Sequence, residues 1–355
     1  MEGAWTIAFL GPKASYTHQA ALNAFSGSNF HLEPLIAIED VFEAVQCSHA
    51  NRGVVPFENS TNGSVVQTLD LFADLQKRNP DIIVCGEAYV GVRHCLLGHV
   101  KKPVPASTFS SAVIEANDDL SPISSGRATP TLTMPDPLQP KTQPLTNIKH
   151  VRKLYSHPQA WGQCKSFLSA YLKGSERQDV SSTSRAAELV ASDESGTSAA
   201  ISSEIAARVH SLDILAQGIE DRPDNTTRFL IIMRRSSPDS RHGEMHDTPG
   251  IQDCPDDQND GMDTHKSLVS FTVDHEDAGA LTRALAVFQK HGLNLTSFNS
   301  RPSGIAPWNY IFFVEFKGRR CGGGEGAVNA ALRELDEVAR GRRWLGSWES
   351  NLDRR

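Results

Sequence analysis

The sequence predicts a mixed α/β protein in which a large α/β domain precedes a small ferredoxin-like domain. Two observations support this prediction. Up to about residue 235, short apolar runs of strand length alternate with amphipathic helical patterns, which is typical of α/β domains. From about residue 266, the patterns follow the order strand, helix, strand, strand, helix, strand. This βαββαβ order predicts a ferredoxin-like sandwich.

Each element of the large domain is predicted from its apolar pattern and from the residues at its ends. Gly11 and Pro12 end the first strand, whereas Ser156 and Pro158 suit the N-cap and first turn of a helix that runs toward Leu172. The predicted elements are a strand at 5–10, a helix at 17–25, a strand ending at 56, a helix at 65–75, a strand at 151–155, the helix from 158, a strand at 198–201, a helix at 204–209 and a strand at 229–233.

The small domain is predicted from six further segments, and two stretches of the chain lack the pattern of a packed core. Residues 101–147 are rich in Ser, Pro and Thr, which is typical of an insert, and the polar, Asp-rich residues 236–265 read as a linker. The predicted domains are therefore 1–235, with an insert at about 101–147, and 266–352 after the linker. The small domain's predicted elements are a strand at 268–274, a helix at 279–290, strands at 293–300 and 310–316, a helix at 327–339 and a strand at 344–348.

The composition excludes several classes of function. The 355 residues include 35 Lys and Arg against 42 Asp and Glu, for a net charge of −7. Nucleic acids and anionic membranes are bound by basic surfaces, so we expect neither as a partner. No apolar run approaches the roughly 18 residues that cross a bilayer, and the start Met1-Glu2-Gly3 lacks the basic region of a signal peptide. We therefore expect a cytoplasmic protein.

Motifs for metals and nucleotides are missing or misplaced. The six cysteines lie far apart without a C-x-x-C pair, which argues against a disulfide framework and a zinc site. Residues 322–327 formally fit G-x-G-x-x-A, but too little chain follows to complete a dinucleotide-binding sheet. His242 and His246 have helical spacing, but they lie in the predicted linker and do not form H-E-x-x-H. We expect no metal site.

Three turns rich in Ser, Thr and Asn follow predicted strands and precede predicted helices, at residues 14–17, 59–64 and 156–157. Helix N-termini attract anions, and ligands of open α/β sheets bind at the carboxyl ends of strands. Each turn alone could be only a helix cap, but three together favour a carboxylate ligand. His157 could contact that ligand or support a residue that does, and the sequence places no partner carboxylate near Glu58.

Residues 225–229, Asn-Thr-Thr-Arg-Phe, form the most informative segment. A hydroxyl and a guanidinium lie together at the start of an apolar strand, where a purely structural strand would favour another β-branched apolar residue. Arg228 could bind a carboxylate through two hydrogen bonds, and Thr227 could donate a hydrogen bond to a leaving oxygen.

Together, these segments resemble the prephenate dehydratase family. The small domain is similar to the ACT module that accompanies these enzymes, through residues 279–281 and 299–302, although Asn299 stands where the family usually has Glu. Ala14 stands where Gly is usual. The resemblance covers nearly the whole chain except the insert and the linker. The other matching segments are GPKASYTHQAA at 11–21, VVPFENSTNGSV at 54–65, TLDL at 68–71, HCLL at 94–97, YSHPQA at 155–160, QC at 163–164 and NTTRF at 225–229.

The resemblance implies a catalytic domain of two lobes, like a periplasmic binding protein, with the substrate in the cleft. Thr227 matches the family's catalytic threonine. The implied substrate contacts are Ser15, Asn59, Ser60, Thr61, Ser156, Gln163, Arg228 and Phe229, and the implied effector contacts are Gly279, Ala280, Leu281, Asn294, Leu295, Asn299 and Arg301.

The implied reaction converts prephenate to phenylpyruvate, water and CO₂ in phenylalanine biosynthesis. The substrate ring itself accepts and delivers the electrons, so we expect no cofactor. ACT modules commonly pair across subunits around an amino acid, which predicts a homo-dimer or tetramer inhibited by phenylalanine. No chorismate mutase helices precede Trp5, which suggests a monofunctional enzyme. Two alternatives stay open: the amino analogue arogenate as substrate, and a ligand-binding protein without catalysis.

Overall fold

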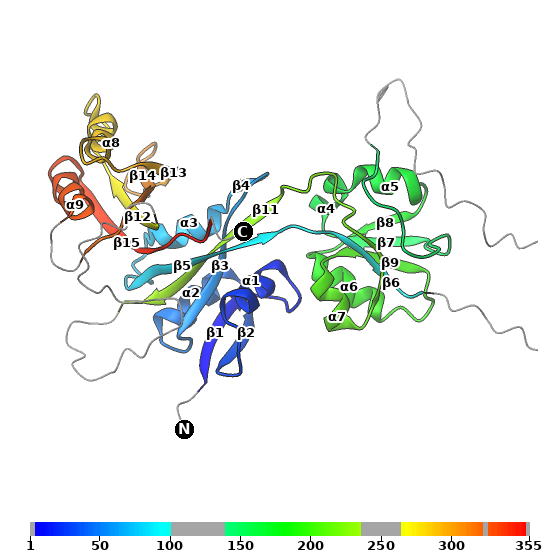
Figure 1. The fold of residues 1–355 in the computed structure, drawn as a ribbon. Helices are drawn as coiled ribbons and strands as arrows, with labels where there is room; N and C mark the ends of the chain where they lie inside the picture. Colours follow the sequence, from blue (N-terminus) through cyan, green and yellow to red (C-terminus); the bar gives the residue numbers. More distant parts are fainter. Residues whose placement is uncertain (1–3, 101–138, 236–263, 322–325, 353–355) are drawn as a thin grey trace, which may run out of the picture. The chain divides into compact units, whose positions relative to one another are not determined.

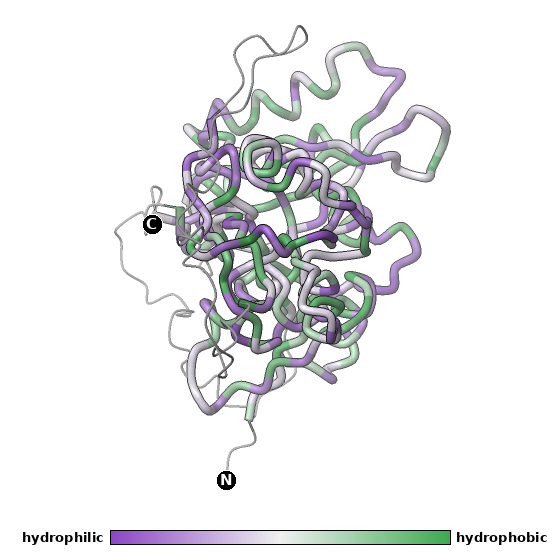
Figure 2. Tube along the Cα trace, turned by 90° about the vertical axis from the view of Figure 1, so that its right-hand side faces the viewer, coloured by the Kyte–Doolittle hydropathy of each residue, from purple (hydrophilic) through white to green (hydrophobic). Residues whose placement is uncertain are grey.

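The computed structural model describes residues 4–100, 139–235, 264–321 and 326–352, which form two compact units (Figure 1). Unit 1 comprises Met1–Gly11, Ala20–Val90 and Thr226–Arg355, and unit 2 comprises Pro12–Gln19 and Gly91–Asn225. The chain therefore passes from unit 1 to unit 2 and back twice, and its second passage builds most of unit 2. Within each unit, hydrophobic and hydrophilic stretches alternate along the trace, as an α/β pattern requires (Figure 2).

Unit 1 contains a six-stranded sheet in the order β2-β1-β3-β11-β5, with β4 paired to β3. The first three strands of this order are parallel, whereas β11 is antiparallel to β3. This arrangement results from the chain path, because β11 is the strand on which the chain returns from unit 2. The elements are β1 (Trp5–Leu10), β2 (Phe30–Leu35), α2 (Ile38–Gln46), β3 (Arg52–Asn59), β4 (Gly63–Ser64), α3 (Val66–Ala73), β5 (Ile82–Gly91) and β11 (Thr226–Arg234), while α1 (Tyr16–Ala24) is divided between the units.

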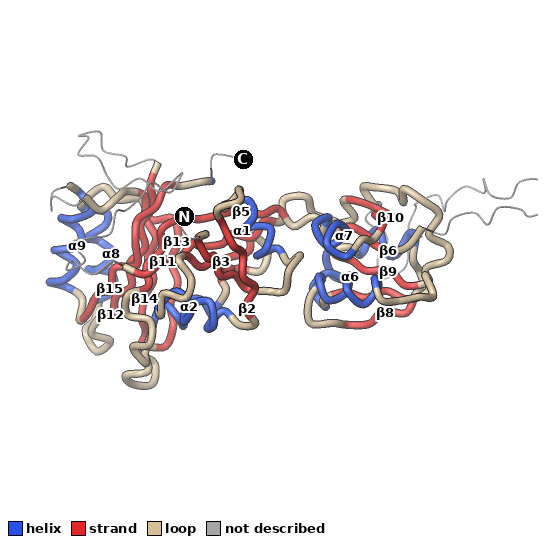
Figure 3. The backbone as a smooth tube through the Cα atoms, turned by 90° about the horizontal axis from the view of Figure 1, so that it is seen from below, coloured by secondary structure: helices blue, strands red, loops and turns tan. Residues whose placement is uncertain are grey.

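The C-terminal part of unit 1 has the predicted βαββαβ order and forms a four-stranded sheet, β13-β14-β12-β15. We call this part, residues 264–352, the C-terminal domain. Helices α8 and α9 lie on the same side of its sheet (Figures 1 and 3). Its elements are β12 (His265–Thr272), α8 (Ala280–Lys290), β13 (Leu295–Pro302), β14 (Tyr310–Lys317), α9 (Ala327–Val338) and β15 (Gly341–Glu349).

Both faces of the C-terminal sheet are buried, because alternate side chains point to opposite faces. Val269 and Val314 pack beneath α8 and α9, in a core that also holds Ala284 and Leu335. Leu268 and Phe313, which precede these two valines, point to the opposite face and pack into the core of the six-stranded sheet. That shared core includes Phe42, Val55, Phe57, Phe72, Val84, Leu230, Leu268, Phe313, Leu345 and Trp348. The C-terminal domain is therefore joined to the six-stranded sheet by a continuous apolar core.

Gly346 marks a close backbone approach between the C-terminal domain and the six-stranded sheet. Its φ is +128°, and a Cβ there would lie 2.1 Å from the carbonyl oxygen of Val84. We expect Gly346→Ala to lower the free energy of unfolding by about 1–3 kcal/mol or more. The added Cβ would overpack this contact, and alanine would also be strained at this positive φ. Urea denaturation measures this loss. The control is Gly341→Ala on the same strand, where a Cβ meets nothing within 4 Å, and equal stability of the two variants would contradict the tight approach.

Unit 2 is a five-stranded sheet in the order β10-β6-β9-β7-β8, covered by helices on both faces. Leu96 and Ile201 face α4 and α5, whereas Cys95 and Ala200 face α6 and α7. The elements are β6 (Cys95–Gly98), β7 (Lys153–Ser156), α4 (Pro158–Gln163), α5 (Lys165–Tyr171), β8 (Glu176–Asp179), α6 (Thr183–Ala191), β9 (Ser198–Ser202), α7 (Glu204–His210) and β10 (Asp213–Gln217).

The predicted fold class is confirmed, with local corrections. The helix predicted from 158 toward 172 is two helices, because it breaks at Cys164. Its N-cap is His157 rather than Ser156, since the His157 ring accepts a hydrogen bond from the backbone N–H of Gln159. The predicted linker and most of the predicted insert lie outside the described residues, so the domain boundaries stay predictions. In the described part of the chain, no helix has the length and apolar content needed to span a membrane.

Candidate active site

The antiparallel pairing of β3 and β11 places Thr227 directly opposite Asn59. Both side chains are half-buried, and the Asn59 side-chain amide donates a hydrogen bond to the Thr227 hydroxyl oxygen over 2.9 Å. Two residues that are 168 positions apart in the chain therefore form one polar pair. This pairing brings together the predicted catalytic residue and one of its predicted substrate contacts.

The orientation of the Asn59 amide follows from the turn after β3. The Asn59 side-chain oxygen accepts hydrogen bonds from the backbone N–H groups of Thr61 and Asn62, both over 3.0 Å. Because only the amide oxygen can accept these bonds, the NH₂ group must face Thr227. Thr227 is therefore the acceptor, and the bond does not use its hydroxyl hydrogen. That hydrogen can be donated to a bound molecule.

The remaining predicted contacts in this turn support the same pairing. The Ser60 backbone N–H donates to the carbonyl oxygen of Thr226 over 2.9 Å. In return, the Ser60 hydroxyl oxygen accepts from the Thr226 backbone N–H over 3.0 Å. Ser60 and Thr61 are exposed, so their side chains lie at the surface beside the Asn59–Thr227 pair.

Arg228 differs from its predicted role as a substrate contact. Its side chain is only 8% exposed, and its guanidinium group forms ion pairs with Glu58, Glu87 and Glu315. Neighbouring side chains on a strand point to opposite faces, so Thr227 and Arg228 do not share one ligand-facing surface. Phe229 is 1% exposed and lies in the protein interior. We therefore correct both predictions: Arg228 is an internal ion-pair residue, and Phe229 is a core residue.

In unit 2, Gln163 is held by a buried histidine. The Nε2 atom of His94 lies 2.7 Å from the Gln163 side-chain oxygen. Burial lowers the pKa of His94 more than the hydrogen bond with Gln163 and the charge of Glu220 raise it, so the ring is neutral at pH 7. Since an amide oxygen only accepts, Nε2 carries the ring hydrogen. The NH₂ group of Gln163 is not used in this bond and can serve a ligand.

The two predicted serine contacts of unit 2 have structural partners. The Ser15 hydroxyl oxygen accepts a hydrogen bond from the backbone N–H of His18 over 3.2 Å, as a helix cap does. Ser156 is fully buried, and its hydroxyl donates to the carbonyl oxygen of Ile201 over 2.9 Å. Its zero exposure corrects the prediction that Ser156 contacts substrate. His157 is the N-cap of α4, where its ring accepts the backbone N–H of Gln159.

The predicted effector residues do not form one cluster in a single copy of the chain. Gly279 is the N-cap of α8, whereas Asn294 and Leu295 follow its C-terminal end. The eleven-residue helix between them is about 16 Å long. Ala280 is buried, while Gly279, Asn294 and Leu295 are exposed and Leu281 is partly buried.

Asn299 and Arg301 contact the six-stranded sheet and its helix instead. The side-chain oxygen of Asn299 accepts from the Ser64 hydroxyl over 2.6 Å. Arg301 binds the Asp70 carboxylate through two hydrogen bonds of 2.6 and 3.0 Å. The structure thus assigns both residues a contact between the C-terminal domain and the segment that follows the Asn59 turn.

Sequence reasoning missed three buried charged residues, Glu87, Lys266 and Glu315. Their side chains are 0%, 7% and 1% exposed. Glu315 did carry a signal, because it interrupts the apolar run of β14 on the face opposite α8 and α9. A charged residue on that face is expected at the surface of an isolated small domain, so its burial depends on the packing of the C-terminal domain.

Comparisons with known proteins identify the family of this chain. The sequence profile of the family described as prephenate dehydratase matches residues 7–113 and 139–237. A bifunctional chorismate mutase/prephenate dehydratase of Aquifex aeolicus is 35% identical over 98% of this chain and 74% of that protein. A probable prephenate dehydratase of Saccharomyces cerevisiae is 31% identical over 87% of this chain and 86% of that protein.

A solved structure has the same fold. The crystal structure of prephenate dehydratase in complex with L-Phe from Arthrobacter aurescens has a TM-score of 0.69 at 22% identity, over 97% of this chain and 90% of that one. The profile match includes the segments that carry Asn59, Gln163 and Thr227, and both relatives are more than 30% identical over most of this chain. The chain therefore belongs to the prephenate dehydratase family.

Proposed function

We propose that Thr227 assists the departing hydroxyl group in the decarboxylating dehydration of prephenate, the reaction of this family. The observation that carries the proposal is the hydrogen bond of 2.9 Å from Asn59 to Thr227. Because Thr227 accepts this bond, its own hydrogen can be donated to the leaving oxygen. Donors placed where charge develops in a transition state typically contribute a factor of about 10²–10³ to the rate.

The chemistry needs little more than this assistance and a fixed substrate pose. The bond between the ring and its carboxylate breaks, and its electron pair moves through the ring. The C–O bond to the para hydroxyl then breaks, and the hydroxyl leaves as water after gaining one proton. The products are phenylpyruvate, CO₂ and water, and the ring becomes aromatic. We propose Ser15, Asn59, Ser60, Thr61 and Gln163 as the substrate contacts, and positioning as their main contribution.

The C-terminal domain is proposed to be an ACT module through which phenylalanine inhibits the enzyme. Support comes from its βαββαβ sheet and from the Arthrobacter aurescens relative, which was solved with L-Phe. Because Gly279 and Leu295 lie at opposite ends of α8, we propose that two copies of the chain together form the effector site. A homo-oligomer is therefore part of this proposal, as are dehydration without mutase activity and a cytoplasmic location.

The first experiment measures phenylpyruvate formed from prephenate by the purified protein, with arogenate and chorismate as parallel substrates. We expect turnover of prephenate, none of chorismate, and inhibition by millimolar phenylalanine. Light scattering during the same titration checks for the oligomer. Tight binding of prephenate without conversion would instead indicate a ligand-binding protein, and preferential turnover of arogenate would change the assigned substrate.

A further inference from the structure

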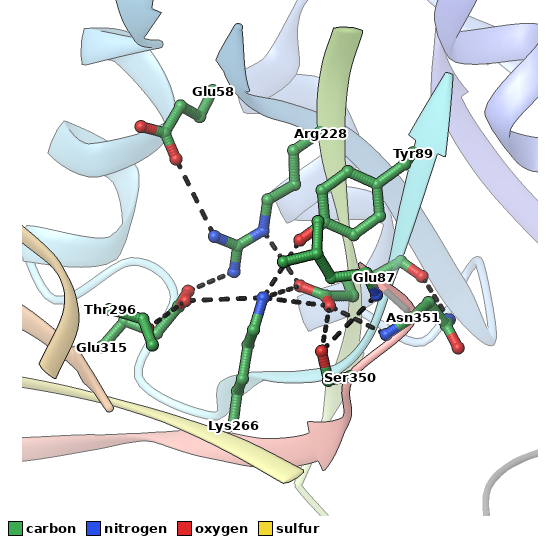
Figure 4. A network of polar contacts seen from close by, with 10 residues as sticks. Glu58, Glu87, Tyr89, Arg228, Lys266, Thr296, Glu315, Ser350 and Asn351 are labelled. Carbon is green, nitrogen blue, oxygen red and sulfur yellow. Dashed lines mark hydrogen bonds and ion pairs between the residues drawn. The ribbon is translucent and has the colours of Figure 1, made fainter. Parts of the chain in front are cut away.

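A buried cluster of four charged residues joins the C-terminal domain to the strand that carries Thr227 (Figure 4). We call Glu87, Arg228, Lys266 and Glu315 the Arg228 cluster. Their side chains are between 0% and 8% exposed. Glu87 lies on β5 and Arg228 on β11 of the six-stranded sheet, whereas Lys266 and Glu315 lie on β12 and β14 of the C-terminal domain.

Each carboxylate of the cluster has two cationic partners. Glu315 forms an ion pair with Arg228 and lies 3.8 Å from the ammonium group of Lys266. Glu87 lies 3.0 Å from the Nε atom of Arg228 and 3.2 Å from Lys266. Two buried positive and two buried negative charges therefore balance. This balance matters because removal of one partner of a buried pair leaves an uncompensated charge.

Glu87 and Arg228 remain ionised despite their burial. Burial alone would raise the pKa of Glu87, but Arg228 and Lys266 outweigh it and the pKa is lowered. Burial alone would likewise lower the pKa of Arg228, yet Glu315 and Glu87 outweigh it and the pKa is raised. A shift of Glu315 from Arg228 toward Lys266 would keep every carboxylate of the cluster paired. Glu315 lies within reach of both cations of the cluster.

One side of the cluster reaches the catalytic pair directly. Arg228 follows Thr227 on β11, and it is paired in register with Glu58, the residue before Asn59 on β3. Its guanidinium also lies 3.8 Å from the Glu58 carboxylate. Thr227 and Arg228 are therefore neighbours on β11, and their register partners Asn59 and Glu58 are neighbours on β3. Because Thr227 and Arg228 are consecutive residues of β11, a shift of the Arg228 backbone would also move Thr227.

The other side of the cluster reaches the strand predicted to bind the effector. Thr296 on β13 donates a hydrogen bond to the Glu315 carboxylate over 2.7 Å. Thr296 is exposed and follows Asn294 and Leu295, two of the predicted effector residues. A ligand that contacts this segment can therefore change the Thr296–Glu315 contact.

We propose that Arg228 is a positioning residue that transmits the state of the C-terminal domain, through Thr296 and Glu315, to the catalytic Thr227. This proposal rests on the proposed dehydratase function and adds a route for its regulation. When Glu315 holds Arg228, β11 keeps Thr227 against Asn59. When the effector strand moves and Glu315 turns toward Lys266, Thr227 loses that support.

The test combines two substitutions with one control, all measured as turnover of prephenate with and without phenylalanine. Glu315→Gln removes the charge that holds Arg228. We expect kcat per folded enzyme to fall about 10-fold with KM within twofold of wild type, because misplacement of a catalytic group affects the transition state more than substrate binding. If Glu315 had only a structural role, the substitution would lower the amount of folded protein, and kcat per folded enzyme would stay unchanged.

Thr296→Val keeps all charges of the Arg228 cluster and removes only the hydrogen bond to Glu315. We expect the phenylalanine concentration for half-inhibition to rise at least threefold, and Thr296→Ser to restore it. The matched control is Asp336→Asn, which breaks a surface pair with Arg342 (2.7 Å) within the same domain. This pair includes no residue of the Arg228 cluster and does not contact Thr296, so kcat and the inhibition curve should stay unchanged.

Wild-type kinetics in both Glu315→Gln and Thr296→Val would overturn the inference, and Thr296→Val decides alone if Glu315→Gln does not fold. If the wild type shows no phenylalanine inhibition, the kcat of Glu315→Gln decides. A wild-type protein that does not convert prephenate contradicts the proposed function instead, so the two failures are distinguishable.

Discussion

Thr227→Ala is expected to lower kcat about 10²–10³-fold with a small change in KM. The reason is that the Thr227 hydroxyl is held by Asn59 as an acceptor, so its hydrogen serves the leaving oxygen mainly in the transition state. Steady-state kinetics with prephenate measure this effect. Thr227→Ser keeps the hydroxyl and should retain most of the activity.

Thr226→Ala is the matched control, because it truncates the adjacent threonine and keeps the backbone bonds between Thr226 and Ser60. We expect this variant to stay within about threefold of wild-type kcat, since it removes no donor from the proposed reaction. Near wild-type turnover in Thr227→Ala would exclude Thr227 as the group that assists the hydroxyl. A loss expressed mainly as a higher KM would assign it to substrate binding instead.

Asn59→Asp is expected to lower kcat about 10²-fold at pH 8, although it only replaces the side-chain NH₂ group by an oxygen atom of similar size. The carboxylate oxygen that replaces the amide oxygen can still accept the N–H bonds of Thr61 and Asn62, so the turn is kept. The other oxygen would accept the Thr227 hydrogen rather than donate to Thr227. The substitution thereby takes the proposed donor away from the substrate.

The same variant should recover as the pH falls from 8 toward 5. A carboxyl group has an ordinary pKa of about 4, and the nearby dianionic substrate raises it. Once protonated, the carboxyl group introduced by Asn59→Asp can again donate a hydrogen bond to Thr227, so the ratio of wild-type to variant kcat should narrow in acid. Thermal denaturation controls for folding. A ratio that is constant across this pH range would show that the direction of the Asn59–Thr227 bond is not important for catalysis.

Local patterns were sufficient to predict the α/β class of the large domain and the βαββαβ order of the small one. Alternation and apolar runs identified strands such as Trp5–Leu10 and Ser198–Ser202. The break at Cys164 between α4 and α5 was not predicted, because the apolar pattern continues across it. Strand β8 was missed because all of its residues are exposed, so it carries no apolar signal.

The site residues also divide into those that the sequence predicted and those whose contacts only the structure revealed. Thr227 and Asn59 were identified by their residue types in matching segments, and the β3–β11 register brings them together. Arg228 was assigned to the ligand because a guanidinium beside a hydroxyl suggests anion binding, although the alternation of side chains along β11 already argued against it. Its true partners lie 141 and 87 positions away, at Glu87 and Glu315, and no local pattern specifies such pairs.

The sequence by itself determined the fold class and the βαββαβ order of the C-terminal domain, because these depend on local propensity and periodicity, and it singled out the residues of the Asn59–Thr227 pair. Only the tertiary structure decided which way the Asn59 amide faces, that Ser156 and Phe229 are buried, and that Arg228 is held by the C-terminal domain. Hydrogen-bond direction and burial depend on the groups that a long-range register brings into contact. Those contacts exist only once β3 meets β11 and the C-terminal sheet packs against both.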